Sequence, residues 1–432
     1  MKTEKDSGLS GNDKFKVKDI SLAKDGRLKI SLAEKNMPVL MELRRANRGK
    51  RPLKGIRISG CLHVTKETAV LVETLRDLGA TVSWSGCNPL STQDDVAAAL
   101  AQAGVQVFAW RGQNNDDYYW CIRKCLEIKP NITVDDGADL VFYIHEKMPE
   151  YLAGMIGGCE ETTTGAMRIK AMARDGKLKY PVTSVADAKT KADFDNIWGT
   201  GQSTIDGILR ATNTMFAGKT AVVAGYGHVG SGIAERARGL GANVIVTEVD
   251  SMAALKARMN GFRVMKMIDA AKEGDIFVTA TGCRDVITAS HVREMKDGAI
   301  LANSGHFDVE VNVSAILKEA GGKKRRVRPD MDEYVVKGKR IFILSEGRLV
   351  NLAAAEGHPS EVMDMSFANQ LLSILEIVRD KNSGKEAKPQ VRLVTPEQDA
   401  LVARMKLLSM GSSIDKLTKE QEKYLSGYSE GT

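Results

Sequence analysis

Three glycines near the middle of the chain have the spacing of a dinucleotide-binding loop. Gly225, Gly227 and Gly230 follow the apolar run 220–224 (TAVVA) and open a helical pattern over 228–241. The first glycine permits a tight turn, the second lets a pyrophosphate approach the backbone, and the third lets helix and strand pack closely. Glu248 follows Gly225 by 23 residues, where an acid accepts hydrogen bonds from ribose hydroxyls and repels a 2′-phosphate. The pattern predicts NAD binding rather than NADP binding.

Further side chains that can move protons follow other apolar runs. They comprise acids, a lysine and three histidines, namely His63, Asp136, Glu161, Lys191, Asp195, His306 and His358. Each alone has a simpler interpretation as a helix cap, a turn residue or part of an ion-pair network. Open α/β sheets, however, bind ligands at the carboxyl ends of their strands, so we expect these side chains to meet. Together they predict a catalytic site that faces the dinucleotide.

Short β-branched runs alternate with helical patterns and predict an α/β fold of two Rossmann-like, doubly wound parallel sheets. The predicted strands are 56–63, 81–85, 105–110, 131–135 and 181–185 in the first unit, and 220–224, 243–247, 262–265, 275–279, 298–302 and 341–345 in the second. A helix from about Phe194 to Phe216 is the predicted hinge, and the helical stretch 359–380 should pack back on the first unit. The predicted domains are a substrate-binding domain (1–195 and 358–400), an NAD-binding Rossmann domain (196–357) and a small C-terminal tail (401–432).

The composition excludes several classes of protein. Of 432 residues, 43% are apolar and 27% charged, which is typical of a globular chain with a large core. The N-terminus is polar and no run approaches the roughly 18 apolar residues of a membrane span, so we expect a cytoplasmic protein without membrane contact. The net charge of +7 is spread along the chain and gives little support to nucleic-acid binding. The six cysteines form no C-x-x-C pair, so we predict free thiols and no metal site.

The order of the motifs closely resembles that of the S-adenosylhomocysteine hydrolases. The matching runs are GCLHVTKETAV at 60–70, DDG at 135–137, EETTTG at 160–165, TKADFDN at 190–196, the glycine loop, GHFDVE at 305–310, EGRLVNL at 346–352 and GHPS at 357–360. The similarity spans about residues 38–425. It implies a homotetramer with tightly bound NAD that reversibly hydrolyses S-adenosyl-L-homocysteine to adenosine and L-homocysteine. In that family NAD oxidises the ribose 3′-hydroxyl, homocysteine leaves from C5′, water adds, and the ketone is reduced again.

The resemblance implies catalytic roles for His63, Asp136, Glu161, Lys191, Asp195, Asn196 and His306. Lys191 would remove the 3′-hydroxyl proton, which requires a pKa lowered by burial. Asp136 would handle the C4′ proton and His63 would assist loss of the thiolate and activation of water, although the division of protons between these two stays open. His306 would support the 3′-keto chemistry and Asn196 would orient its neighbours.

The resemblance also implies two sets of binding residues. Those for the substrate are Thr65 and Glu67 at the purine, Asp136, Glu161, Lys191 and Asp195 at the ribose, and His358 closing the purine pocket. Those for the cofactor are Thr162, Thr163, Thr164, Asn196, Gly225, Gly227, His228, Val229, Gly230, Glu248, Ser304, His306 and Asn351. For His228 we favour a helix cap over a pyrophosphate contact.

Two departures from the family pattern stand out. Thr200 occupies a position at which the family often has a cysteine, so a redox role for that cysteine is absent. The sequence ends at EKYLSGYSEGT, short of the Lys- and Tyr-containing extension of many members, which implies a short-tailed, archaeal or thermophile-like type. Three alternatives remain: an inosyl substrate, a dehydrogenase that releases NADH, and a non-catalytic paralogue that binds NAD. A carboxylate at Glu67 favours adenine.

Overall fold

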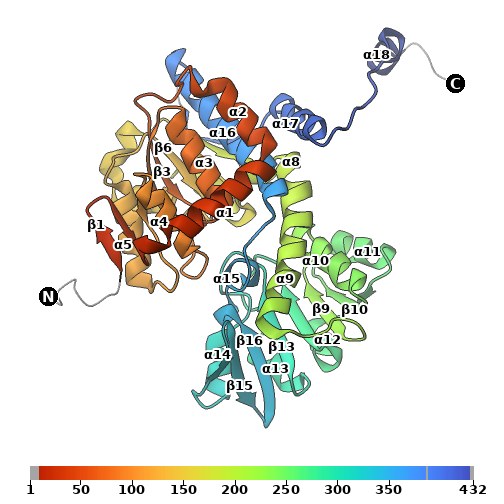
Figure 1. The fold of residues 1–432 in the computed structure, drawn as a ribbon. Coiled ribbons are helices and arrows are strands. Elements are labelled where there is room, and N and C mark those ends of the chain that lie inside the picture. The colour runs from red at the N-terminus through yellow and green to blue at the C-terminus, as the bar shows by residue number, and fades with distance from the viewer. Residues whose placement is uncertain (1–8, 386–387, 429–432) are drawn as a thin grey trace.

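The computed structural model describes residues 9–385 and 388–428 and contains two open β-sheets, each covered by helices (Figure 1). The first sheet has the order β1-β2-β5-β4-β3-β6-β7-β8-β17. Its strands are β1 (Ser10–Asn12), β2 (Phe15–Val17), β3 (Arg57–Cys61), β4 (Thr81–Ser85), β5 (Gln106–Phe108), β6 (Ile132–Asp135), β7 (Gly157–Glu160), β8 (Val182–Ser184) and β17 (Val391–Leu393). Its helices are α1 (Ala23–Asn36), α2 (Pro38–Arg48), α3 (Lys66–Asp77), α4 (Asp94–Gln102), α5 (Asn115–Leu126), α6 (Asp139–Lys147) and α7 (Thr163–Arg174).

The second sheet has the order β11-β10-β9-β12-β13-β16-β15-β14. Its strands are β9 (Thr220–Ala224), β10 (Asn243–Thr247), β11 (Arg263–Val264), β12 (Ile276–Thr279), β13 (Ala299–Asn303), β14 (Arg325–Arg328), β15 (Met331–Val336) and β16 (Lys339–Leu344). Its helices are α10 (His228–Gly239), α11 (Ser251–Met259), α12 (Met267–Glu273), α13 (Ala289–Glu294), α14 (Val313–Glu319) and α15 (Val350–Ala353). The predicted α/β class with two mainly parallel sheets is confirmed.

Both sheets have antiparallel margins that the sequence did not reveal. β1 pairs antiparallel with β2, and β15 pairs antiparallel with both β14 and β16. The prediction also missed β7, whose sequence GGCE has no β-branched residue, although all four of its residues are buried. Burial between neighbouring strands and covering helices therefore outweighs weak strand propensity at this position.

The helix between the sheets begins earlier than predicted and contains a π-helical segment where a regular α-helix was expected. A short turn, α8 (Lys189–Lys191), leads into the π-helical segment η5 (Ala192–Gly199) and then α9 (Thr200–Thr212). α9 ends at Asn213 in the left-handed conformation, short of the predicted end at Phe216. π-helical segments are rare and frequently occur at functional sites, and η5 carries Asp195 and Asn196.

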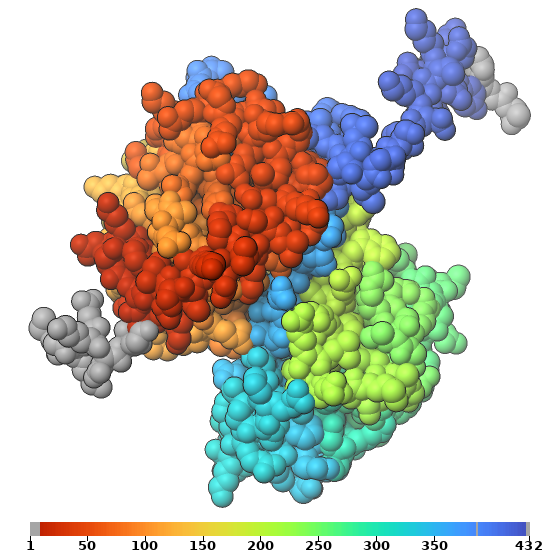
Figure 2. Space-filling model, in the orientation of Figure 1, coloured from red at the N-terminus to blue at the C-terminus, as the bar shows by residue number. Residues whose placement is uncertain are grey.

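After the strands of the second sheet, the chain returns to the first sheet. As predicted, the helical stretch, α16 (Ser360–Asn382), packs there, and its Phe367 and Leu371 are fully buried in that core. α17 (Pro396–Ser409) lies on α16, while α18 (Lys419–Ser426) stands clear of the body (Figure 2). α17 crosses residue 400, where we placed a domain boundary, and the domain division stays a prediction. Among the described residues, no helix has both the length and the apolar character needed to cross a membrane.

The helical stretch of η5 and α9 is fixed to α10 of the second sheet by close contacts at two glycines. A Cβ atom on Gly232 of α10 would lie 2.1 Å from the carbonyl oxygen of Ile197, and one on Gly201 would lie 2.8 Å from the Gly232 backbone. Such distances are far below van der Waals contact, so only glycine permits this approach of η5 and α9 to α10.

We expect Gly232→Ala to lower the free energy of unfolding by about 1–3 kcal/mol, because the backbone of η5 cannot yield to the new methyl group. Thermal unfolding monitored by calorimetry measures this change. Gly239→Ala is the matched control in the same helix, since a Cβ there meets nothing within 4 Å. Equal melting temperatures for the two variants would show that the glycine contact does not hold the helices together.

Candidate active site

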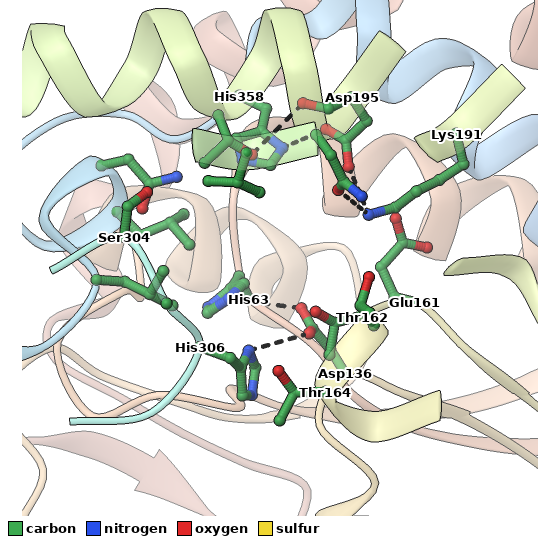
Figure 3. Close-up of a pocket in the computed structure, with 18 of the residues that line it drawn as sticks. His63, Asp136, Glu161, Thr162, Thr164, Lys191, Asp195, Ser304, His306 and His358 are labelled. Atoms are coloured by element: carbon green, nitrogen blue, oxygen red, sulfur yellow. Dashed lines mark hydrogen bonds and ion pairs between the residues drawn. The ribbon is translucent and has the colours of Figure 1, made fainter. Parts of the chain in front are cut away.

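One cavity between the two sheets gathers most of the predicted site residues (Figure 3). The first sheet and its helices supply one wall, and the loops after the second sheet's strands supply the other. The predicted residues that line it are His63, Thr65, Glu67, Asp136, Glu161, Thr162, Thr163, Thr164, Lys191, Asp195, Asn196, Gly227, His228, Val229, Ser304, His306, Asn351 and His358. Gly225, Gly230 and Glu248 lie outside the lining.

Lys191 is buried in a cluster of acceptors at one wall of this cavity. Its Nζ lies 2.8 Å from Asp195 Oδ2 and donates a hydrogen bond of 2.8 Å to Asn196 Oδ1, and the residue is 4% exposed. Burial alone would lower the pKa of Lys191, but the carboxylates of Asp195 and Glu161 outweigh burial and raise it. Our expectation of a pKa lowered by burial is therefore wrong for this arrangement, because two acids share the pocket with the amine.

Asp195 also contacts a histidine from the loop between α15 and α16, where the chain crosses back from the second sheet to the first. Its Oδ1 contacts His358 Nδ1, and burial, which would raise the pKa of Asp195, is outweighed by His358 and Lys191, which hold it well below its usual range. The other ring nitrogen of His358, Nε2, lies 3.0 Å from Thr200 Oγ1. Thr200 thus occupies the predicted cysteine position as a hydrogen-bond partner of His358, which the sequence did not indicate.

Glu161 completes the cluster from the end of the first sheet. Its oxygens accept hydrogen bonds from Ser366 Oγ and, at 2.6 Å, from Gln370 Nε2 of α16. Burial raises the pKa of Glu161 to about 7, against the opposing effect of Lys191. Near neutral pH this carboxyl group can therefore either accept or donate a hydrogen bond. Ser366 and Gln370 were not predicted, because an amphipathic helix gives no local sign that its polar residues face a distant strand.

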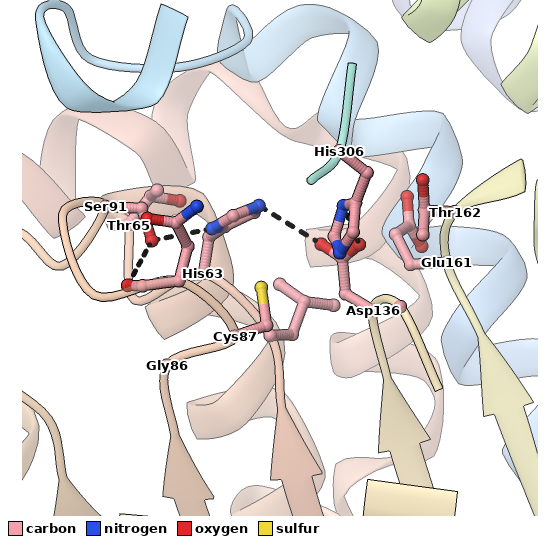
Figure 4. A network of polar contacts seen from close by, with 12 residues as sticks. His63, Thr65, Gly86, Cys87, Ser91, Asp136, Glu161, Thr162 and His306 are labelled. Carbon is pink, nitrogen blue, oxygen red and sulfur yellow. Dashed lines mark hydrogen bonds and ion pairs between the residues drawn. The ribbon is translucent and has the colours of Figure 1, made fainter. Parts of the chain in front are cut away.

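Beside the Lys191 cluster, a second carboxylate, from the end of the neighbouring strand, lies between two imidazoles (Figure 4). Asp136 Oδ2 is 3.4 Å from His63 Nε2, and Asp136 Oδ1 is 3.6 Å from His306 Nδ1. His63 Nδ1 lies 2.7 Å from Ser91 Oγ, which fixes the ring. Burial lowers the pKa of His63 to about 4 despite the nearby Asp136 carboxylate, so the ring is neutral at physiological pH. A neutral imidazole beside a carboxylate can both accept and return a proton.

The same three side chains form the one group in the described part of the chain with possible metal-ligand spacing. Atoms of His63, Asp136 and His306 lie within 4.8 Å of one another. The sequence analysis predicted no metal site, and that stays a prediction. The two contacts of Asp136 with His63 and His306 are 3.4 and 3.6 Å long. Catalytic hydrogen bonds are often this long before a substrate binds.

A third group of polar residues lies at the start of α3 and of α16. Thr65 caps α3, and the Glu67 carboxylate is 1% exposed, accepting a hydrogen bond of 2.6 Å from Ser360 Oγ. Lys66 Nζ lies 3.3 Å from Glu67 Oε1 and 3.0 Å from Glu356 Oε2. The Glu67 side chain is therefore almost fully buried, and its carboxylate is an oriented hydrogen-bond acceptor in the cavity lining.

The glycine loop has the geometry of a pyrophosphate site. Gly225 has φ +95°, and a Cβ on Gly230 would lie 2.0 Å from the carbonyl oxygen of Gly225, so both require glycine. A Cβ on Gly227, by contrast, would meet nothing within 4 Å, which leaves open space above the first turn of α10. That turn has no side-chain cap, so its backbone N–H groups are free to bind an anion.

Other cofactor residues also fit a dinucleotide. Glu248 accepts hydrogen bonds from the backbone N–H of Tyr226 at 2.7 Å and of Asp250 at 3.0 Å, which fixes its carboxylate at the end of β10. Asn351 is fully buried, and its Oδ1 has no hydrogen-bond partner, as expected for an acceptor that awaits an amide donor. Ser304 Oγ lies 2.7 Å from Thr204 Oγ1.

The favoured interpretation of His228 as a helix cap is wrong. α10 begins at His228 itself with Gly227 at the cap position, and the His228 ring reaches Asp193 Oδ1 of η5 at 3.2 Å. The side chain lines the cavity from this position. Its direction is set by a polar partner, Asp193, in another helical segment, which the local sequence does not specify.

Glu160 connects two loops of the site, although we predicted no role for it. It is fully buried, and its carboxylate accepts backbone hydrogen bonds from Gly137 at 2.8 Å, Ala138 at 3.0 Å and Thr162 at 3.0 Å. It thereby joins the loop that carries Asp136 to the loop that lines the cofactor side. Burial, together with the nearby acids Asp135 and Asp136, raises the pKa of Glu160 well above its ordinary value. Its place in the EETTT run was a usable signal.

Comparisons with known proteins show the family of this chain. The S-adenosyl-L-homocysteine hydrolase family model matches residues 14–153, and the model of that family's NAD binding domain matches residues 196–357. The chain is 59% identical over 420 residues to an adenosylhomocysteinase of Saccharolobus solfataricus, covering 97% of this chain and 100% of the relative.

Two further relatives come from other archaea. An adenosylhomocysteinase of Aeropyrum pernix is 57% identical, covering 95% of this chain and 98% of that protein. An S-inosyl-L-homocysteine hydrolase of Methanocaldococcus jannaschii is 54% identical, covering 97% of this chain and 100% of that protein. These relatives confirm the predicted likeness to archaeal and thermophilic members. The chain is therefore an enzyme of the S-adenosyl-L-homocysteine hydrolase family and carries that family's NAD-binding domain.

Proposed function

We propose that this chain catalyses the reversible hydrolysis of S-adenosyl-L-homocysteine to adenosine and L-homocysteine. The observation that carries the proposal is the presence of two proton-handling groups in one cavity. Lys191 with its acids forms the first group, and Asp136 between His63 and His306 forms the second. A nucleoside placed between them would have its ribose hydroxyls at one group and its C4′–C5′ bond at the other.

This chemistry needs an oxidation because the thioether at C5′ is a poor target for direct hydrolysis. NAD, when bound, supplies the hydride acceptor that makes C3′ a ketone and later returns that hydride. With a ketone at C3′ the C4′ proton becomes acidic, so homocysteine can leave from C5′ and water can add in its place. Glu248, the first turn of α10 and Asn351 would hold the adenosine ribose, the pyrophosphate and the nicotinamide amide.

Lys191 is the proposed base for the 3′-hydroxyl proton. In the described arrangement the amine is paired with Asp195 and has a raised pKa. The ribose hydroxyls would donate hydrogen bonds to Asp195 and Glu161 and so draw these acceptors away from the amine. Their weaker hold on the amine would let burial lower the pKa of Lys191. Asn196 would keep the amine oriented during this exchange.

Asp136, His63 and His306 are the proposed groups at C4′ and C5′. The Asp136 carboxylate, held between the two rings, would take the C4′ proton. His63 is neutral and fixed by Ser91, so it would pass a proton to the leaving thiolate or take one from water. His306 approaches from the second sheet and would support the ketone. The division of protons between Asp136 and His63 stays open.

The purine would lie between Thr65, Glu67 and His358. The hydrogen bond from Ser360 and the ion pair with Lys66 both involve Oε1 of Glu67, which leaves Oε2 of this buried carboxylate as an acceptor. The 6-amino group of adenine can donate to such an acceptor, whereas the 6-oxygen of hypoxanthine would face it with like polarity. This contrast favours the adenosyl substrate, although one relative is named an S-inosyl-L-homocysteine hydrolase.

Two further features complete the proposal. All six cysteines are free and five are buried, which supports a reducing compartment such as the cytoplasm. Val249 and the α11 residues Met252, Leu255 and Met259 are exposed apolar side chains, as expected for a surface that another copy covers in a homo-oligomer, which we propose is a tetramer. Neither nucleic acid nor membrane is a proposed partner.

Incubation with S-adenosyl-L-homocysteine tests the function directly. We expect free homocysteine thiol to appear while bound NAD is reduced only transiently, because the same cofactor is oxidised again in each turnover. Thiol detection and absorbance of the reduced nicotinamide are followed together. Stoichiometric accumulation of NADH would identify a dehydrogenase instead, and full NAD occupancy without thiol release would identify a non-catalytic paralogue.

Lys191→Ala should leave NAD bound but lower the rate of its reduction by adenosine by about 10²–10⁴-fold, since the base is lost. Stopped-flow absorbance with adenosine measures this rate, and mass spectrometry of the intact complex measures NAD retention. Lys189→Ala is the matched control, being an exposed lysine in the same short helix. Rapid reduction of NAD in Lys191→Ala would remove Lys191 from the role of base.

The purine preference rests on Glu67. We expect kcat/KM for the adenosyl substrate to exceed that for the inosyl substrate by at least about tenfold, and Glu67→Gln to narrow this ratio, because glutamine can also donate to an oxygen. Glu356→Gln serves as control, since Glu356 pairs with Lys66 from the exposed side. A wild-type preference for the inosyl substrate would contradict the assignment of Glu67.

A further inference from the structure

The short helix that carries Lys191 begins without a cap from its own sequence. Residue Ala188 occupies the cap position of α8 and has no side-chain acceptor. The first two backbone N–H groups, of Lys189 and Thr190, instead donate hydrogen bonds of 2.7 and 2.9 Å to the two carboxylate oxygens of Asp399. Asp399 lies on α17, about 210 residues further along the chain. One acid from the C-terminal region therefore replaces the missing cap.

The contact between Asp399 and α8 is part of a larger polar network. The Thr190 hydroxyl donates to Asp399 Oδ1 and accepts a hydrogen bond of 2.8 Å from Asn369 Nδ2 of α16. Gln398 Nε2 in turn donates to Asn369 Oδ1 at 3.1 Å. Three helices from distant parts of the sequence thus meet at Thr190, which is itself buried and directly precedes Lys191.

α17 has a second attachment that does not touch α8. Lys406 Nζ lies 2.9 Å from Asp364 Oδ2. Asp364 is fully buried, and its Oδ1 accepts a hydrogen bond of 2.9 Å from the backbone N–H of Leu40. Val402, between the two attachments, is fully buried in the first core. Because both ends of this contact are anchored, α17 can hold Asp399 in a fixed position against α8.

We propose that Asp399 is a positioning residue for Lys191, which acts by fixing the start of the segment that carries the catalytic amine. The inference rests on the proposed role of Lys191. The amine must lie within hydrogen-bond reach of the ribose hydroxyl, and a displacement of about 1 Å can cost about a hundredfold in rate. The segment continues directly into η5, which carries Asp195 and Asn196. Loss of the Asp399 contact at the start of α8 would therefore displace Lys191 together with these two residues.

Asp399→Ala tests the proposal in the full-length, NAD-loaded protein. We expect hydrogen–deuterium exchange of the peptide containing Lys189–Lys191 to rise, and reduction of bound NAD by adenosine to slow by about ten- to a hundredfold. KM for adenosine should change less than kcat, because the purine contacts at Glu67 are remote from α8. Asp399→Asn, which keeps one acceptor oxygen, should lie between Asp399→Ala and the wild type.

Two control variants separate positioning from general loosening. Glu397→Ala removes an exposed acid from the same first turn of α17, and should match the wild type. Lys406→Met weakens the other attachment of α17, and should retain most of the rate of NAD reduction. If Lys406→Met slows the reaction as much as Asp399→Ala does, or if Asp399→Ala exchanges faster without slowing it, the proposal is overturned. A wild-type protein that does not reduce NAD would contradict the proposed function itself, whereas the exchange result does not depend on that function.

Discussion

The buried ion pair between Lys191 and Asp195 is the interaction on which the site depends. Both residues are less than 5% exposed, so neither charge could stay in the core without its partner. Asn196, His358 and Glu161 supply the remaining contacts, and they come from η5, the loop between α15 and α16, and the first sheet. The pair therefore holds three separate parts of the chain at one point, at the place where a ribose would be oxidised.

The ion pair lies in a cavity to which both sheets contribute residues. The first sheet supplies Glu161, Asp136 and His63 at the ends of its strands, and the second supplies the dinucleotide loop and His306. An enzyme that oxidises a sugar and then breaks a neighbouring bond needs the cofactor site of the second sheet and the acids and His63 of the first sheet around one substrate. The close glycine contact of η5 and α9 with α10 fixes the intervening helix to the cofactor side, while Asp399 fixes its start to the substrate side.

Much of this arrangement was predictable because its residues lie directly after strands or inside a spaced glycine motif. The carboxyl ends of the predicted strands β3, β6 and β13 placed His63, Asp136 and His306 in one cavity, as parallel sheets require. Glu161 follows β7, which was not predicted, and was instead indicated by the EETTTG run. The predictions that failed depend on side-chain contacts, most of which join segments that are distant in the sequence; the pairing of Lys191 with Asp195, four residues further on, is the exception. The raised pKa of Lys191 depends on two acids, and His228 is directed by Asp193. The roles of Thr200, Ser366 and Asp399 likewise depend on partners more than 150 residues away.

The central claim is that substrate converts Lys191 from a paired cation into a base by engaging its acidic partners. The most direct measurement is the rate of reduction of bound NAD after mixing with adenosine, followed by absorbance across a pH series. We expect this rate to rise with pH through an apparent pKa well below the ordinary lysine value of about 10.4. A rate that reaches half its maximum only at or above that value would show that the pair persists in the complex and that Lys191 is not the base.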